Sequence, residues 1–227
     1  MASRPTALVT GASRGIGQAA AHALSETHDV LLGGRDGAAL QQLAAQLPGA
    51  RPWPVELTDD AALAEACSDV AELDVLVHSA GTIELGAVGE VTADSWRRTF
   101  ELNLIAVTEL TRQLLPALRR SRGHVVLVNS GSGLAVKPEW GSYAASKFAL
   151  RAYADVLRAE EAPNGLRVTS VYPGRTATDM QRGVREAEGG AFEPENYLRP
   201  ESVAGPIAQA VQASEDAHQT EIVIRPS

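Results

Sequence analysis

The sequence lacks several features that mark common functional classes of protein. Its 227 residues include 1 cysteine, Cys67, which excludes an intrachain disulfide and has no metal-ligating residues nearby. We expect Cys67 to be a small buried hydrophobic residue on a helix. The formal net charge of -8 leaves no basic face for nucleic acid. No apolar run approaches the roughly 20 residues that span a bilayer. We therefore expect no metal, no nucleic-acid partner and no membrane span.

A secretory signal is also missing from the start of the chain. The segment MASRPTALVTGAS passes directly into a strand and a glycine-rich turn, without the longer apolar stretch of a signal peptide. Hydrophobic residues make up 44% of the chain and charged residues 21%, which is enough apolar material for a core. We expect a soluble cytoplasmic protein.

Short apolar runs alternate with segments of helical spacing. The runs are mostly continuous, as in parallel strands covered on both faces. They lie at 6–10, 29–34, 50–57, 73–81, 124–130, 166–174 and 220–226, and the helical segments at 17–27, 36–46, 59–70, 92–120, 142–162 and 200–213. This alternation predicts a single-domain, Rossmann-like α/β fold over residues 1–227. Its doubly wound parallel sheet has about seven strands, with helices on both faces.

Three local features refine this prediction. Thr92 or Asp94 can cap the long helical segment at its start. Pro116 is expected to bend or interrupt the same helix near its end. Residues 180–198 are polar and weakly periodic, so we expect a mobile irregular excursion over one end of the sheet.

The first turn has the glycine spacing of a nucleotide site. In ALVTGASRGIGQAAAHAL, glycines 11, 15 and 17 follow the first strand and open a helix. Such a turn lets the backbone approach a pyrophosphate, and the helix presents free N–H groups to it. Short glycine patterns also occur in tight βα turns without a ligand. Position after the first strand of an alternating chain favours a dinucleotide.

The end of the second strand favours NADP(H) over NAD(H). NAD sites usually place an acidic residue there to hold the ribose hydroxyls. In LLGGRD, Gly34 stands at that position and leaves room for a 2′-phosphate, which Arg35 can bind. Arg14, inside the glycine turn, can approach from the other side. Alternatively, both arginines are surface charges and Asp36 only caps the next helix.

Residues Tyr143 and Lys147 in GSYAASKFAL lie four apart, on one face of a helix. A nearby ammonium stabilises a phenolate, which brings the tyrosine pKa closer to neutrality. The spacing would arise by chance in roughly one sequence in thirty, so an ordinary helix face stays open at this point. Ser130 ends an apolar strand and Asn103 lies in the apolar segment FELNLIAV. Each can be structural alone, but together with the nucleotide turn they indicate a site.

These elements, in this order, resemble the short-chain dehydrogenase/reductase family over essentially the whole chain. TGASRGIG (10–17) is similar to its cofactor turn, and HSAG (78–81) stands where Asn-Asn-Ala-Gly is usual. YPGRTATDM (172–180) resembles the nicotinamide-side segment. Ser130 precedes Tyr143 by 13 residues, the usual interval (143 − 130). The four catalytic positions of the family fall on Asn103, Ser130, Tyr143 and Lys147.

The resemblance implies a role for each of these residues. Tyr143 is the general acid when a carbonyl is reduced, and Ser130 hydrogen-bonds the substrate oxygen. Lys147 holds the nicotinamide ribose and lowers the tyrosine pKa, and Asn103 helps to hold a water. The cofactor-binding residues, from the residues themselves and from the resemblance, are Gly11, Ser13, Arg14, Ile16, Gly34, Arg35, Glu56, Leu57, Ala80, Gly81, Tyr143, Lys147, Pro173, Gly174, Thr176 and Thr178.

Two sites depart from the family pattern. His78 and Ser79 replace two asparagines, and we interpret His78 as structural. Glu56 stands where the family often has an aspartate near adenine. The substrate cleft is expected near residues 133–140 and 180–198. Its aromatic and aliphatic residues indicate an apolar substrate; they are Leu134, Trp140, Phe192 and Tyr197.

The leading functional hypothesis is an NADP(H)-dependent enzyme that interconverts a small-molecule carbonyl and a secondary alcohol. One alternative is a 3-oxoacyl-carrier-protein reductase, whose carrier would meet a basic patch, unless these arginines are only a solvated helix face. They are Arg97, Arg98, Arg119, Arg120 and Arg122. Another alternative is a non-catalytic nicotinamide sensor, which would not need the catalytic set. The family also implies a homotetramer or homodimer.

Overall fold

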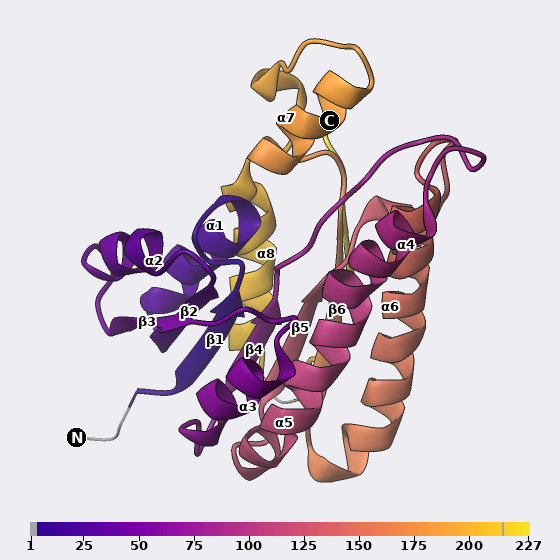
Figure 1. The fold of residues 1–227 in the computed structure, drawn as a ribbon. Helices are drawn as coiled ribbons and strands as arrows, with labels where there is room; N and C mark the ends of the chain where they lie inside the picture. The colour runs from indigo at the N-terminus through magenta and orange to yellow at the C-terminus, as the bar shows by residue number, and fades with distance from the viewer. Residues whose placement is uncertain (1–3, 215) are drawn as a thin grey trace.

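The computed structural model describes residues 4–214 and 216–227, and it is built on one parallel sheet (Figure 1). The seven strands lie in the order β3-β2-β1-β4-β5-β6-β7, and every neighbouring pair is parallel. They are β1 (Thr6–Thr10), β2 (Asp29–Gly34), β3 (Ala50–Pro54), β4 (Val75–His78), β5 (His124–Val128), β6 (Arg167–Pro173) and β7 (Glu221–Ile224). The strand order reverses between β1 and β4, as in doubly wound folds, so the predicted fold class is confirmed.

Helices cover both faces of the sheet, as Figure 1 shows. They are α1 (Gly15–Ser25), α2 (Gly37–Ala44), α3 (Asp60–Ser68), α4 (Ala93–Phe100), α5 (Ala106–Arg120), α6 (Gly141–Glu161), α7 (Asp179–Ala187) and α8 (Pro200–Gln212). Helices α1, α2 and α8 pack on one face and α3, α5 and α6 on the other. Successive strand residues point to opposite faces, so the inner strands contribute to two hydrophobic cores, whereas the edge strand β7 packs on only one of them.

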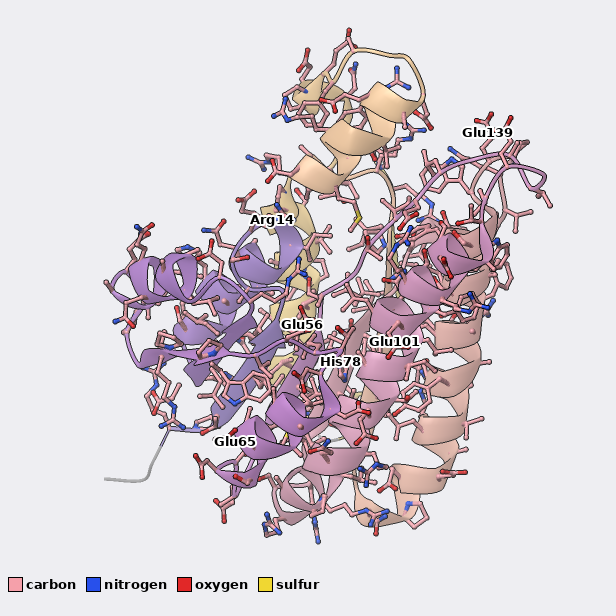
Figure 2. The ribbon with its side chains drawn as sticks, viewed as in Figure 1. Arg14, Glu56, Glu65, His78, Glu101 and Glu139 are labelled. Carbon is pink, nitrogen blue, oxygen red and sulfur yellow. The ribbon has the colours of Figure 1, made fainter. Side chains whose placement is uncertain are left out.

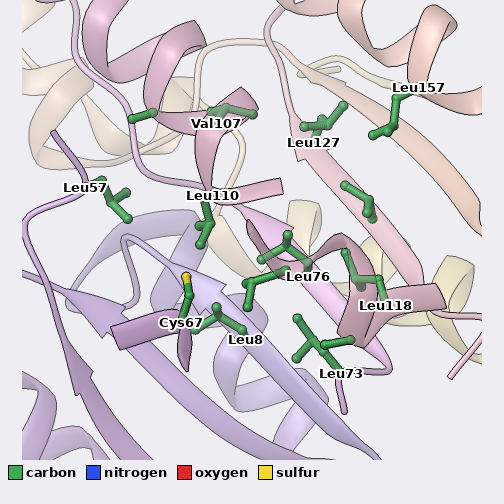
Figure 3. Packing of buried hydrophobic residues seen from close by; sticks show 14 of the residues in the cluster. Leu8, Leu57, Cys67, Leu73, Leu76, Val107, Leu110, Leu118, Leu127 and Leu157 are labelled. Atoms are coloured by element: carbon green, nitrogen blue, oxygen red, sulfur yellow. The ribbon is translucent and has the colours of Figure 1, made fainter. Parts of the chain in front are cut away.

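Figure 3 shows the core on the α3, α5 and α6 face. Leu8 of β1 and Leu76 of β4 meet Leu110 of α5 there. Cys67 is buried in the same cluster, as expected for a small hydrophobic residue. Burial raises the pKa of its thiol to about 11, so the thiolate is scarce at neutral pH.

The long helical segment differs in part from its prediction. Helix α5 runs through Pro116 to Arg120, so the proline does not interrupt the helix, and a bend at this residue stays a prediction. Leu114 and Leu118 on either side of the proline are fully buried, and this packing outweighs one missing hydrogen bond. The irregular part lies earlier, in a π-helix at Glu101–Ile105. At the other end of the segment, the Thr92 hydroxyl caps α4 by accepting from Ser95 N, as predicted.

The excursion predicted as irregular contains a helix, α7, and a 3₁₀ turn at Pro194–Asn196. Thr178 caps α7 because its hydroxyl accepts a hydrogen bond from Gln181 N. Val184 is the buried apolar anchor of this nine-residue helix, and Gly183 follows the polar pair Gln181–Arg182. One anchor gives too little periodicity for a sequence pattern to reveal the helix.

Strands β4 and β5 end before their apolar runs do. Ser79–Gly81 and Asn129–Ser130 therefore lie in loops at the carboxyl edge of the sheet. The Thr10 hydroxyl fixes the first loop by accepting from Ser79 N (3.1 Å) and Ala80 N (3.2 Å). Ligands of open α/β sheets bind at this edge. Within residues 4–214 and 216–227, no helix is long and apolar enough to cross a membrane.

Candidate active site at the carboxyl edge of the sheet

Tyr143 and Lys147 lie in the first two turns of α6, and both side chains are buried, with 7% and 5% of their surface exposed. Ser130 follows β5 and starts the 3₁₀ turn Gly131–Gly133, where its hydroxyl accepts from Ser132 N at 3.1 Å. The Ser130 hydroxyl lies near the Tyr143 phenol, where it acts to lower the tyrosine pKa. The structure therefore brings these two predicted site residues together beside the end of β5.

The electrostatics of this pair are dominated by burial. Burial raises the pKa of Tyr143, and the nearby Ser130 hydroxyl offsets only part of that rise. Burial also lowers the pKa of Lys147 to about 8. The lysine Nζ donates to Val128 O at 3.0 Å and lies 5.7 Å from the centre of the tyrosine ring. In this geometry the phenol is protonated at neutral pH, and the lowering of its pKa by Lys147 stays a prediction for the cofactor complex.

Asn103 lies in the π-helix and is almost fully buried. Its Oδ1 accepts from Thr82 N (2.8 Å), and its Nδ2 donates to Thr82 O (2.9 Å) and to Ser146 Oγ (3.1 Å). Ser146 in turn donates to Tyr143 O at 2.7 Å. The asparagine therefore joins the loop after β4 to the helix that carries Tyr143. Its predicted role in holding a water is not tested by these contacts.

Asn129 has a structural role that sequence reasoning missed. Its Oδ1 accepts from Ser130 N (2.8 Å), and its Nδ2 donates to Lys147 O (3.1 Å). A Cβ on Gly133 would lie 2.5 Å from the same Oδ1, so the turn closes tightly over this amide. Asn129 sets Ser130 relative to α6. A buried amide beside Ser130 at the end of a strand was the available signal.

The glycine turn packs closely against its neighbours. Gly11 has φ +67°, and a Cβ there would lie 2.9 Å from Ala80 N. Gly17 would place a Cβ 2.3 Å from Gly11 O. Gly15, with φ +59°, brings the turn next to the Thr178 methyl group, which would be 3.1 Å from its Cβ. Packing alone thus requires two of the glycines, and the turn meets both the loop after β4 and the Thr178 segment.

This turn fits the pyrophosphate of a dinucleotide. Arg14 is the N-cap residue of α1 in an extended conformation and gives no side-chain cap within the described chain, so the first-turn N–H groups stay open to an anion. Side chains at the end of β6 border the turn. Thr176 Oγ1 donates to Gly174 O (3.1 Å) and Thr178 Oγ1 to Thr176 O (3.3 Å), which fixes the segment that faces Gly15.

The two arginines predicted to select NADP are exposed and already ion-paired. Arg35 Nη1 lies 3.3 Å from Glu56 Oε2, and Arg14 Nη1 lies 3.7 Å from Asp179 Oδ2. Figure 2 shows Arg14 beside the start of α1 and Glu56 in the segment after β3. A Cβ on Gly34 would make only ordinary contacts, 3.5 Å or more, with Leu40. Packing therefore does not require glycine at this position.

Two other predicted positions at this end are partly structural. Asp36 caps α2 by accepting from Ala39 N at 3.0 Å, as the alternative interpretation held. The Leu57 side chain is buried in the core on the α3 face, so its side chain is not free for a cofactor. Its backbone remains beside Glu56.

The expected substrate wall divides into two groups. Trp140 packs edge-on against Tyr143, with ring centres 5.9 Å apart, and both contact Val184 of α7. Ile83 and Leu85 pack on this cluster. Phe192 and Tyr197 instead stack on each other at 5.6 Å. Phe192 lines a groove of about 550 Å³ between α1 and α7, which also contacts Arg14 and Thr178.

His78 is buried in the centre of the molecule (Figure 2). Its Nε2 lies 2.9 Å from the Thr111 hydroxyl, which donates to Val107 O at 2.8 Å. Burial lowers the pKa of His78 to about 3, so the ring is neutral. These contacts tie β4 to α5 and support the structural interpretation.

The comparison with protein families identifies this arrangement. The short chain dehydrogenase family model matches residues 5–189. The chain belongs to this family. Among similar sequences, glycine betaine reductase ATRR of Emericella nidulans is 36% identical over 97% of this chain. Dehydrogenase/reductase SDR family member 7B of Bos taurus is 34% identical over 82% of it. The chain spans 18% and 62% of the lengths of these two relatives.

Solved structures of short-chain dehydrogenases superpose closely. A single-residue variant of actinorhodin polyketide ketoreductase with NADPH has a TM-score of 0.90 at 27% identity, covering 99% of this chain and 97% of that one. A putative NAD(P)-dependent gluconate 5-dehydrogenase from Beutenbergia cavernae with bound NADP has a TM-score of 0.87 at 28% identity, covering 98% and 95%. These likenesses agree with the membership of the chain in the short chain dehydrogenase family.

Proposed function

We propose that the protein is an NADP(H)-dependent oxidoreductase that interconverts a carbonyl and a secondary alcohol, with Tyr143 as the general acid and base. The observation that carries this proposal is the placement of Ser130 next to Tyr143, which is itself buried beside Lys147 at the carboxyl edge of the sheet. The glycine turn opens at the same edge. Proton transfer and cofactor binding are thus adjacent.

In the direction of reduction, the Tyr143 hydroxyl donates its proton to the carbonyl oxygen. Its raised pKa keeps the phenol protonated at neutral pH, as an acid catalyst needs. Ser130 Oγ hydrogen-bonds the same oxygen and stabilises the negative charge that develops on it. When bound, the nicotinamide supplies the hydride. Lys147, held by Val128 O, places a cation behind the tyrosine and favours the phenolate that is left.

Tyr143→Phe tests this role. We expect turnover to fall by about 10²–10⁴-fold because the proton donor is lost, while the dissociation constant for NADPH changes little. The matched control is Tyr153→Phe, which removes a hydroxyl from the same helix α6 at a position outside the site. Stopped-flow NADPH oxidation and fluorescence titration give the two readouts. Full turnover in the Tyr143 variant would refute the assignment.

The cofactor proposal rests on the end of β2. Gly34 is not required by packing, and Arg35 is exposed beside it. We expect Arg35→Ala to weaken NADPH binding by about 10-fold or more, through loss of a charge-assisted contact. NADH binding should change much less. Equal losses for both cofactors, or faster wild-type turnover with NADH, would contradict the NADP preference.

The alternatives receive less support from the site. Arg97 and Arg98 are paired with Asp94 and Glu84 at 2.6 and 2.9 Å, which reduces the charge available to an acyl carrier. A sensor would not need the Ser130–Tyr143 pair. Assays of NADPH oxidation with ketones, aldehydes and acyl thioesters distinguish the three functions.

We also propose that the protein forms a homo-oligomer through α5 and α6. The exposed apolar side chains of Ile105, Phe148 and Val156 agree with such an interface.

A further inference from the structure

Glu56 occupies an unusual place beside the predicted phosphate-binding arginine. Its Oε2 lies 3.3 Å from Arg35 Nη1, and this ion pair joins the loop after β3 to the loop after β2. The side chains are 40% and 76% exposed, respectively. In NAD sites an acidic residue on the second strand holds the ribose hydroxyls. Here the acidic residue comes from the loop after the neighbouring strand β3 and contacts the arginine instead.

Glu56 is held in this position by Thr58. Its Oε1 accepts from the Thr58 hydroxyl (2.9 Å) and backbone N–H (3.3 Å), which leaves Oε2 free to face Arg35. Partial burial alone would raise the pKa of Glu56, but the hydrogen bonds from Thr58 and Arg35 lower it overall. The carboxylate is therefore ionised throughout the neutral pH range. It presents a fixed negative charge to the guanidinium.

We propose that Glu56 is a specificity-determining residue that competes with the 2′-phosphate of NADP(H) for Arg35. The inference rests on the proposed function, because it requires a nicotinamide cofactor in this site. Glu56 contacts Nη1 of Arg35, so a phosphate that binds the guanidinium bidentately through this nitrogen competes with the carboxylate for its donors. An exposed carboxylate pair is weak, so a phosphate with nearly two charges displaces it.

This competition lowers the preference for NADP(H) without abolishing it. The phosphate must break the Arg35–Glu56 contact and then stays close to the displaced carboxylate, which repels it. NADH carries no 2′-phosphate and meets neither penalty. The Thr58 hydrogen bonds keep the carboxylate near Arg35, so they strengthen the effect. The ratio of NADPH to NADH affinity is therefore set by Glu56 as well as by Arg35.

Glu56→Gln tests the proposal with the full chain and binding as the readout. Calorimetric titrations use 2′,5′-ADP, 5′-AMP, NADPH and NADH. We expect Glu56→Gln to tighten binding of 2′,5′-ADP relative to 5′-AMP by about two- to fivefold, the range of an exposed ion pair. The NADPH-to-NADH affinity ratio should rise by the same factor. Glu65→Gln on α3 is the control, since it removes the same charge from an exposed position without touching Arg35.

Two further variants decide what a negative result means. If Arg35→Ala weakens 2′,5′-ADP binding but Glu56→Gln leaves the ratio unchanged, the competition is refuted and the NADP site stands. If Arg35→Ala has no effect on 2′,5′-ADP, the proposed NADP site itself fails. In the double variant, Glu56→Gln should lose most of its effect because Arg35 is absent. If Glu56→Gln still gave its full gain in 2′,5′-ADP affinity in the Arg35→Ala background, Glu56 would act only by repelling the phosphate directly. That result would overturn competition for Arg35.

Discussion

The two ends of the site are built in opposite ways. At the proposed catalytic end, Tyr143 and Lys147 are buried; the Tyr143 carbonyl accepts from Ser146, and the Lys147 ammonium donates to Val128 O. At the adenosine end, Arg14 and Arg35 are exposed and paired with carboxylates. Burial makes electrostatic effects large and geometry rigid, whereas exposure makes them small and adjustable. Under the proposed function, the proton-transfer residues are therefore held rigidly in the interior, and the residues proposed to select the cofactor are adjustable at the surface.

Replacing Lys147 gives the largest effect that this contrast predicts. Lys147→Met should lower turnover by about 10²–10⁴-fold, because the cation behind Tyr143 is lost. The same change should raise the free energy of unfolding at pH 7 by about 1–3 kcal/mol, since a buried ammonium is removed but Val128 O loses its donor. Urea denaturation and steady-state assays measure the two effects.

The gain in stability should depend on pH with a definite sign. The folded pKa of Lys147 is about 8, below its ordinary value of 10.5. Below pH 8 the lysine is protonated in both the folded and the unfolded chain, so the folded wild type bears the full cost of burying the ammonium. The penalty disappears as pH rises from 8 to 10.5, and the advantage of Lys147→Met should disappear with it. Lys137→Met, at an exposed lysine, should change stability by less than about 0.5 kcal/mol at any pH. A destabilised Lys147 variant at pH 7 would contradict the account.

The placement of the proposed catalytic residues beside one another could be predicted from sequence, whereas the contacts between side chains at the proposed adenosine end could not. Tyr143 and Lys147 are neighbours on one helix, and Ser130 ends an apolar strand, so local spacing was enough to find them. The Arg35–Glu56 pair joins two loops 21 residues apart, and no local pattern shows that their side chains meet. The role of Asn129 was missed because one of its two partners, Lys147 O, lies on α6, 18 residues away in sequence.

Other parts of the fold show the same limit. The apolar runs between the helical segments predicted the seven strands, because a strand buried between two layers of helices is hydrophobic along almost its whole length. The same runs overestimated the ends of β4 and β5, where residues such as Ala80 leave the sheet to face the glycine turn. The helix α7 depends on the contact of Val184 with Trp140 and Tyr143, far away in sequence. Long-range packing decides these features.

Substitutions of Gly11 and Gly34 by alanine test whether the backbone at each position is fixed by packing. Gly11→Ala places a Cβ 2.9 Å from Ala80 N at φ +67°, so we expect a loss of about 1–3 kcal/mol in stability and weak binding of both cofactors. Gly34→Ala meets only ordinary contacts with Leu40, so the fold should keep its stability. Its effect should be confined to the NADPH-to-NADH affinity ratio. Thermal unfolding and fluorescence titration measure both. A fold-destabilising Gly34→Ala would mean that Gly34 is structural.

The smallest expected effect comes from Asp179, the partner of Arg14. This pair is longer than Arg35–Glu56, at 3.7 against 3.3 Å, and its carboxylate is more exposed, at 63% against 40%. Asp179→Asn should therefore tighten NADPH binding by less than about threefold. It also removes a charge near the N-terminus of α7, which should destabilise that helix by about 0.3–1 kcal/mol.

Salt distinguishes a surface charge effect from a direct contact with the cofactor. The Debye length is about 10 Å at 0.1 M salt and shorter above it, so the change from Asp179→Asn should shrink as salt is raised. Glu186→Gln, an exposed position on the same helix α7, removes an equal charge farther from Arg14 and should have less effect at every salt concentration. NADPH titrations at low and high salt make the comparison. A change in NADPH affinity above about tenfold that persists in high salt is larger than the loss of an exposed ion pair can cause. It would place Asp179 in contact with the cofactor.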